Sequence, residues 1–188
     1  MDHTSKPNEQ AIQMTRCWVE QFVIKHRLCP FAAKVALEER IDYVICSADE
    51  ALEAVIAFEQ AILKMDHDDS VETLLLILTE GFMDFEDYLD LLAIMQDYLE
   101  HNGYSGTYQL ASFHPDYQFQ DTGFDDVTNY TNRSPLPIIH VLRESSLAEG
   151  LKGFPNPEEI PVRNQKLMTE LERDYLEAVR RGEPVSND

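Results

Sequence analysis

Apolar residues recur along the chain at two spacings, which predict helices and strands in turn. Spacings of three and four residues, as from Ala11 to His26, place apolar side chains on one face of a helix. Short runs of β-branched, aromatic and aliphatic residues are typical of strands. The predicted strands are 41–46, 73–78, 106–113 and 138–142. The predicted helices are 11–26, 31–40, one capped by Ser47 that continues to Leu63, 85–99 capped by Asp84, 144–151, and a last one that carries Leu167 to Val179.

The alternation of strands with helices predicts the α/β class. Strand–helix–strand units make the first three strands parallel, with right-handed crossovers. We therefore expect a single α/β domain over residues 9–182, with a mostly parallel or mixed four-stranded sheet flanked by helices. The polar ends, 1–8 and 183–188, are expected to be flexible.

The connection between the third and fourth predicted strands is long and irregular. About twenty residues after Phe113 show neither helical nor strand periodicity. Loops of this length inside a domain are uncommon and often functional. The length suffices for a parallel crossover as well as for an antiparallel return, so the direction of the fourth strand stays open.

Charge and cysteine content narrow the classes of function. The chain has 188 residues and a formal charge of -20, which disfavours nucleic acid and anionic membrane surfaces as partners. It contains no apolar run long enough to span a membrane, and its three cysteines form no CxxC pair, so a cytoplasmic protein with reduced thiols is expected. Walker, GxGxxG, HExxH and GxSxG motifs are absent.

Cys29 is the first candidate for chemistry. Pro30 favours the first position of a helix, so Cys29 would occupy the cap of the helix predicted over 31–40. A thiol at that position feels the positive end of the helix dipole, which lowers its pKa and favours a nucleophile. The alternative is a small buried side chain, which is the expected state of Cys17 and Cys46.

Two histidines are further candidates, one just after a predicted strand and one inside another. His114 follows the third strand, at the carboxyl edge where open α/β sheets bind ligands. His140 lies inside the fourth strand between apolar neighbours, and a histidine in such a position is more often a hydrogen-bonded core residue than a ligand contact. A parallel fourth strand would bring His140 and Arg143 to the same edge as His114.

Arginine and asparagine side chains supply candidate anion contacts. Arg133, Arg143 and Arg163 flank turns or helix starts in a chain with few basic residues. Arg163 and Asn164 stand near a predicted helix N-terminus, where exposed amides and a guanidinium suit a carboxylate or phosphate. Structural ion pairing is the alternative role. Asn132 adds a neutral hydrogen-bonding group, and the aspartates 116, 121, 125 and 126 either bind a hard cation or cap turns.

Several segments that carry these residues resemble an uncharacterised family of small bacterial proteins, a domain of unknown function. The segments are Leu28-Cys29-Pro30-Phe31-Ala32, the block 109–119 that contains FHPDYQF, the block 129–135 that reads NYTNRSP, His140-Val141-Leu142-Arg143-Glu144 and Ile160-Pro161-Val162-Arg163-Asn164. The similarity runs from about Trp18 to Asn164. It supports the choice of residues and implies no reaction.

Three hypotheses follow for the function. The preferred one is an enzyme that acts on a small anionic metabolite, with Cys29 and His114 as catalytic residues and Arg133, Asn132, His140, Arg143, Arg163 and Asn164 as binding residues. The second is a metal-dependent enzyme that uses His114 with Asp116, His140 or Cys29. The third is a non-catalytic binding or scaffold protein that uses the loop 114–134. The preferred hypothesis requires the long loop to bring His114 and Cys29 into one cavity.

Overall fold

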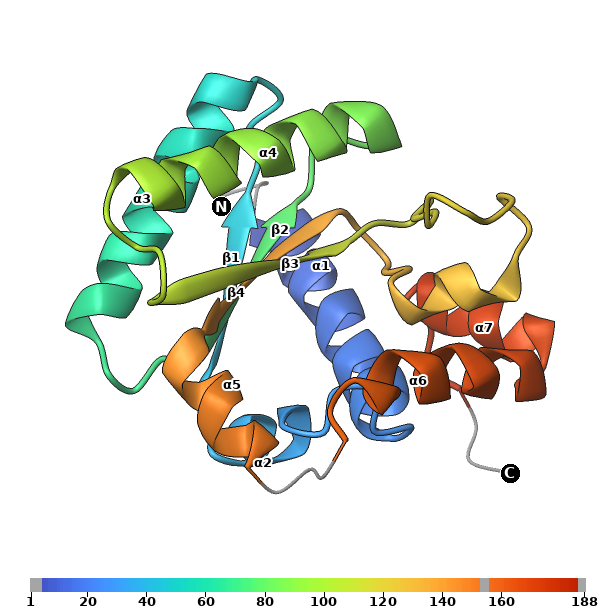
Figure 1. The fold of residues 1–188 in the computed structure, drawn as a ribbon. Coiled ribbons are helices and arrows are strands. Elements are labelled where there is room, and N and C mark those ends of the chain that lie inside the picture. Colours follow the sequence, from blue (N-terminus) through green and yellow to red (C-terminus); the bar gives the residue numbers. More distant parts are fainter. Residues whose placement is uncertain (1–4, 153–155, 186–188) are drawn as a thin grey trace.

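A mixed four-stranded sheet forms the centre of the molecule (Figure 1). The computed structural model describes residues 5–152 and 156–185. The strands β1 (Ile41–Cys46), β2 (Thr73–Leu78), β3 (Tyr108–Phe113) and β4 (Ile138–Arg143) are arranged in the order β1-β2-β4-β3. β1 pairs with β2 in parallel, and β4 is antiparallel to both of its neighbours, β2 and β3. The first three strands therefore run in one direction, and the open question about the fourth is answered as antiparallel.

Two helices cover one face of this sheet. The helices α3 (Ala51–His67) and α4 (Phe85–His101) pack on the side of β2 that carries Leu74, Leu76 and Leu78. Phe58 and Tyr88 are fully buried between these helices and the strands. The crossovers from β1 to β2 and from β2 to β3 pass through these helices (Figure 1).

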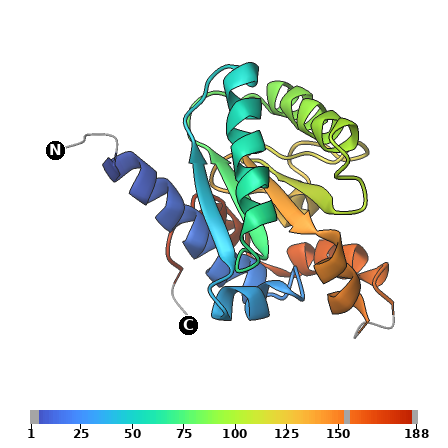
Figure 2. The same cartoon turned by 90° about the vertical axis from the view of Figure 1, so that its left-hand side faces the viewer.

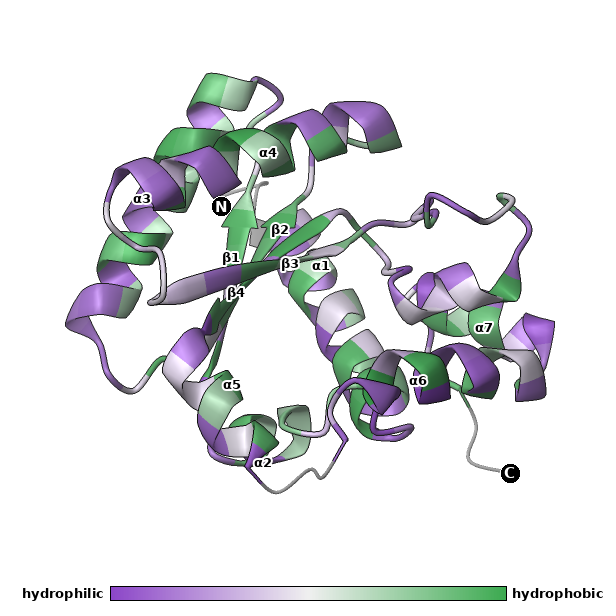
Figure 3. Cartoon of the chain, in the orientation of Figure 1, coloured by the Kyte–Doolittle hydropathy of each residue, from purple (hydrophilic) through white to green (hydrophobic). Residues whose placement is uncertain are grey.

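The opposite face is covered by segments from both ends of the chain. They are α1 (Ser5–Trp18), the π-helical η1 (Val19–Ile24), the 3-10 helix η2 (Val127–Thr131), α6 (Glu159–Glu170) and α7 (Arg173–Arg180). Their buried side chains, including Trp18, Phe22 and Met168, meet Leu75 and Ile77 of β2. Figures 1 and 2 show the two helical layers on opposite sides of the sheet, and Figure 3 shows the apolar strands between them. Two short helices, α2 (Ala32–Leu37) and α5 (Glu144–Leu151), lie close to each other, since Phe31 packs on Gly150.

Several predicted boundaries differ from the observed ones. The first helix already begins at Ser5, inside the segment expected to be flexible, and changes to π-helix at Val19. The last helix is two helices, because Leu171 is extended between α6 and α7. The predicted cap by Ser47 is wrong: Glu50 precedes α3, and Ser47 bonds to the Thr79 hydroxyl at 3.2 Å. Asp84 caps α4 as predicted and accepts from the amides of Glu86 and Asp87. Among the described residues, every helix is too short or too polar to cross a membrane.

Candidate functional site

A pocket of about 340 Å³ lies on the face of the sheet that is covered by η2 and α6. We call it the Cys29 pocket. It gathers three residues that were expected at the site, Cys29, Asn132 and Asn164, from segments far apart in the sequence. The complete lining is Val23, Leu28, Cys29, Phe113, Phe119, Thr131, Asn132, Pro161, Asn164 and Gln165. The lining is therefore apolar on one part and rich in neutral amide and hydroxyl groups on the other.

Side-chain amides hold the walls of the Cys29 pocket together. Asn164 on α6 donates from Nδ2 to the carbonyl of Leu28 at 2.8 Å. Asn132, which follows η2, donates to the carbonyl of Ser112 in β3 at 3.1 Å, and its Oδ1 accepts from Thr131 at 3.0 Å. Gln165 makes no side-chain hydrogen bond to any other residue that the structure describes. Its amide therefore has no protein partner for either its oxygen or its nitrogen among the described residues, unlike those of Asn132 and Asn164.

The environment of Cys29 opposes thiolate formation. Burial raises the pKa of the Cys29 thiol, and hydrogen bonds from the backbone amides of Phe31 and Ala32 lower it by less. The helix α2 starts at Ala32, after the cap residue Phe31, and has only six residues. The prediction of a lowered pKa at a helix cap is therefore wrong in direction, because desolvation outweighs the local amides.

His114 is a buried structural residue. Its side chain is inaccessible to solvent and packs against the rings of both Phe85 and Tyr88, with centroid distances of 5.2 and 5.1 Å. Nδ1 accepts from the amide of Asp116 at 3.0 Å, so Nε2 carries the proton and donates to the carbonyl of Phe82 at 3.1 Å. Burial lowers the pKa of the imidazole, which favours this neutral form. Both nitrogens are thus engaged, and neither is available for acid–base chemistry or a metal.

The predicted shared cavity of His114 and Cys29 is wrong. His114 contacts side chains of α4, on the face covered by α3 and α4. Cys29 lies in the pocket with Phe113, on the opposite face. Successive residues of an extended chain point to opposite sides, so Phe113 reaches the pocket while His114, one residue further, turns away from it.

Arg133 stabilises the loop rather than a ligand. Its side chain is 3% exposed and donates to the carbonyls of Tyr117 at 3.2 Å and Phe124 at 2.7 Å. The guanidinium also lies over the rings of Phe124 and Tyr130, at 4.7 and 4.8 Å from their centroids. This arrangement uses the cation to close the loop between β3 and β4.

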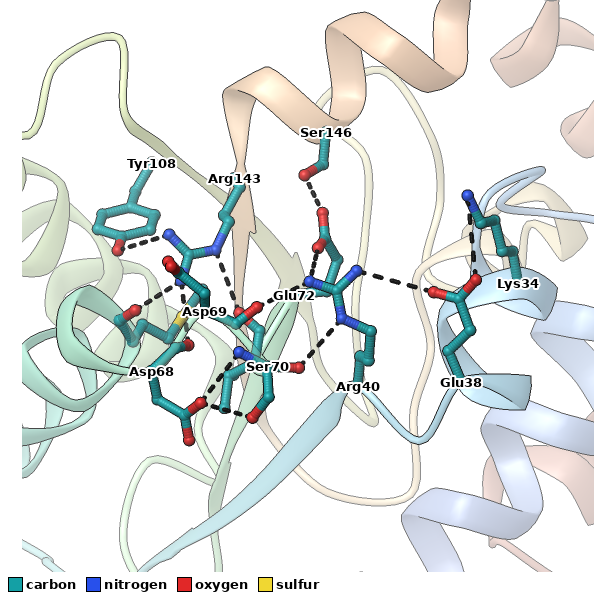
Figure 4. A network of polar contacts seen from close by, with 12 residues as sticks. Lys34, Glu38, Arg40, Asp68, Asp69, Ser70, Glu72, Tyr108, Arg143 and Ser146 are labelled. Carbon is teal, nitrogen blue, oxygen red and sulfur yellow. Dashed lines mark hydrogen bonds and ion pairs between the residues drawn. The ribbon is translucent and has the colours of Figure 1, made fainter.

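Arg143 has an equally structural role at the other end of β4 (Figure 4). Its guanidinium donates to the carbonyls of Val71 at 3.1 Å and Met65 at 2.5 Å, and to the Tyr108 hydroxyl at 3.3 Å. It thereby satisfies one carbonyl group in the last turn of α3 and one in the segment that follows it. The antiparallel direction of β4 places Arg143 opposite Tyr108, at the start of β3, away from the carboxyl edge that a parallel strand would have reached.

Arg163 is the one predicted arginine that adjoins the Cys29 pocket. Its Nη2 donates to the carbonyl of Arg27 and to Oδ1 of Asn164, the latter at 2.8 Å. Asn164 lines the pocket, whereas Arg163 faces a neighbouring cleft. The three arginines therefore do not converge on one anion.

His140 lies on the same face of the sheet as the pocket. Its ring is 6.0 Å from that of Phe113 and is partly exposed. The Thr73 hydroxyl donates to the carbonyl of Val141 and therefore accepts from Nε2 of His140, at 2.7 Å. Nδ1 has no hydrogen-bond partner among the described residues. Desolvation lowers the pKa of His140 to about 4, so the imidazole is neutral at pH 7.

The acidic residues of the loop form caps and ion pairs. Asp126 accepts a hydrogen bond from the amide of Thr128 at the start of η2. Oδ1 of Asp116 lies 3.8 Å from Nη1 of Arg180. Within the described parts of the chain, no three His, Cys, Asp or Glu side chains are arranged to hold a metal ion. The described residues therefore provide no ligand set for the metal site that was predicted around His114.

Some lining residues were missed by sequence reasoning. Phe119 and Thr131 lie in the two long segments that carried the family resemblance, so those segments could have indicated them. Gln165 follows directly on the last of the resembling segments. No local pattern marks Val23, which reaches the pocket only because η1 packs beside it.

Comparison with known proteins assigns a family but no activity. Neither a curated protein nor a solved structure matches the chain significantly. One family model, described as "Protein of unknown function (DUF1415)", matches residues 10–178. The matched range contains every residue that lines the Cys29 pocket. The chain therefore belongs to this family of proteins of unknown function.

Proposed function

We propose that this protein binds a small anionic metabolite whose uncharged part occupies the Cys29 pocket. One observation carries the proposal: Cys29, Asn132 and Asn164, chosen from separate segments of the sequence, line a single pocket. Its volume of about 340 Å³ falls at the lower end of the range for small-molecule sites. Apolar walls with a few placed polar groups are the usual composition of such sites.

The lining also indicates how the ligand would be oriented. Phe113 and Phe119 offer apolar surface, while Asn132, Asn164 and Gln165 offer amide donors and acceptors. No charged side chain lines the pocket among the described residues, so the anionic group of the ligand belongs at its rim. Arg163 is next to Asn164 at that rim.

Binding is better supported than covalent catalysis by the thiol. The raised pKa leaves Cys29 protonated at neutral pH, and a protonated thiol is a poor nucleophile. If the protein is an enzyme, His140 takes the place first given to His114 as proton acceptor. The observation in its favour is Nδ1 of a neutral imidazole that Thr73 holds in one tautomer, since this nitrogen has no partner among the residues that the structure describes.

The test is a thermal-shift screen with a panel of small carboxylates and phosphate esters, followed by calorimetry for each hit. Gln165→Leu keeps the size of the side chain and removes the free amide, so it should weaken a hit by about tenfold and change the free energy of unfolding by less than about 0.5 kcal/mol. Gln96→Leu on the exposed side of α4 is the matched control and should leave binding unchanged. Hits that bind both variants equally, or a panel without hits, would contradict the proposal.

A further inference from the structure

A second cleft lies beside the Cys29 pocket and is rich in cations. We call it the Arg27 cleft. It measures about 300 Å³ and is lined by His26, Arg27, Arg163, Lys166, Leu167 and Glu170. Three cations and one carboxylate give it a formal charge of +2, in a chain whose total is -20. A local positive site on so acidic a protein attracts anions that the rest of the surface repels.

The Arg27 cleft and the Cys29 pocket are lined by neighbouring residues of the same two segments. Arg27 lines the cleft, and the next two residues, Leu28 and Cys29, line the pocket. On α6, Arg163 and Lys166 line the cleft, and Asn164 and Gln165 line the pocket. Hydrogen bonds from Arg163 to the carbonyl of Arg27 and from Asn164 to the carbonyl of Leu28 join the two segments. The cleft and the pocket thus lie on either side of one short contact.

The backbone at Arg27 is held in a costly conformation. Its φ angle is +53°, in the left-handed region that residues other than glycine seldom adopt. Its amide bonds to the carbonyl of Ile24, and its carbonyl accepts from Arg163. Strained residues of this kind cluster at functional sites. The Arg27 side chain lines the cleft.

The cations of the cleft keep unused hydrogen-bonding capacity. The Arg27 guanidinium has no ion pair or side-chain hydrogen bond within the part of the chain that the structure describes. The only ion pair of Lys166 with a described residue is a loose one with Glu170, at 4.0 Å, in which both side chains are largely exposed. Arg163 donates from Nε and Nη2 and leaves Nη1 without a bond among the described residues. This contrasts with Arg143, whose guanidinium donates from all three of its nitrogens to groups of the protein.

We propose that the Arg27 cleft binds the phosphate group of a phosphate monoester whose organic part enters the Cys29 pocket. A phosphate monoester carries a charge between -1.5 and -2 near neutral pH, which matches the formal charge of the cleft, whereas a carboxylate would leave it half neutralised. Its three free oxygens can accept from two guanidinium groups and one ammonium group. The assignment rests on the proposed function, since it names the anionic group of that ligand.

The experiment is an amide NMR titration of the whole chain, at constant ionic strength, with inorganic phosphate and separately with glycerol 3-phosphate. Saturable shifts should concentrate at residues 25–29 and 163–167. Arg27→Gln and Lys166→Gln should each weaken phosphate binding by about fivefold or more. Lys34→Gln makes the same charge change at an exposed lysine outside the cleft and should alter affinity by less than about twofold.

The two phosphate compounds separate this inference from the proposed function. Shifts spread over the surface, or an affinity that Arg27→Gln leaves unchanged, would overturn the phosphate site even if other ligands occupy the Cys29 pocket. Glycerol 3-phosphate should bind more tightly than inorganic phosphate, and Gln165→Leu should remove that difference. Equal affinities for both compounds in the parent protein would overturn the link between the cleft and the pocket.

Discussion

The loop between β3 and β4 and the walls of the Cys29 pocket are both polar, yet they use their polar groups differently. In the loop, Asn129 accepts from the amide of Phe119 and the hydroxyl of Thr122, and donates to the carbonyl of Gly123. His114 and Arg133 likewise form hydrogen bonds with backbone groups of the protein. At the pocket and the adjoining cleft, Gln165 and Arg27 keep theirs unused among the described residues.

This difference shows that polar residues in an irregular segment do not by themselves indicate a binding site. A buried polar group must find a partner, because leaving it unpaired costs about 1–3 kcal/mol. Histidine, asparagine and arginine in a long loop therefore often replace the backbone hydrogen bonds that a helix or strand would provide. A group with unused hydrogen-bonding capacity in a concave site is the better indicator of ligand binding.

The largest expected effect comes from a substitution in the loop between β3 and β4. Asn129→Ala removes a fully buried amide and leaves the Phe119 amide, the Thr122 hydroxyl and the Gly123 carbonyl without it. We expect the free energy of unfolding to fall by about 4 kcal/mol in urea denaturation. Asn102→Ala, at the exposed end of α4, is the matched control and should cost about 1 kcal/mol or less. Equal losses for both variants would contradict a structural role for Asn129.

A smaller effect is expected from pH, and it tests His140 on the pocket side. Because its folded pKa of about 4 lies below the unfolded value of about 6.5, the folded state binds fewer protons between these values. Stability is therefore complete above pH 6.5 and falls as the pH decreases to 4, by about 3 kcal/mol in total. Urea denaturation at several pH values should show this loss, and His140→Gln should reduce it. A pH dependence that His140→Gln leaves unchanged would contradict this assignment to His140.

The smallest expected effect concerns the rate of thiol modification. Burial raises the pKa of Cys29, so alkylation by iodoacetamide at pH 7.5 should be about tenfold slower than in the urea-unfolded chain. Peptide mapping by mass spectrometry separates Cys29 from Cys17 and Cys46, which are buried. Alkylation of Cys29 in the folded protein that is faster than in the unfolded chain would restore the reactive-thiol hypothesis.

Much of the fold was predictable because its signals are local. The strands 41–46 and 73–78 agree with β1 and β2 residue by residue. A run buried on both faces, as in β2, has few alternatives, and the β-branched and aromatic residues of β1 favour a strand. The cap at Asp84 and the helix over 144–151 were also predicted correctly. The break at Leu171 was not, because the apolar spacing continues through it and only packing separates α6 from α7.

The candidate site was predictable in part. Cys29, Asn132 and Asn164 were selected by residue type and position, and they meet in one pocket. His114, Arg133 and Arg143 were selected by the same reasoning and lie elsewhere, with their hydrogen-bonding groups occupied. Residue type states what a side chain can bind, whereas its partners depend on which segments pack around it.

Local sequence patterns were sufficient to identify the α/β class, the four strands and a short list of candidate polar residues, because periodicity and composition act over a few neighbouring residues. Long-range packing was needed to fix the direction of β4, the faces on which His114 and Cys29 lie, and the hydrogen bonds that join residues 27 and 28 to residues 163 and 164. These features depend on contacts between residues as many as 136 positions apart, which no local pattern encodes. Desolvation by those same contacts is also what reversed the expected shift in the pKa of Cys29.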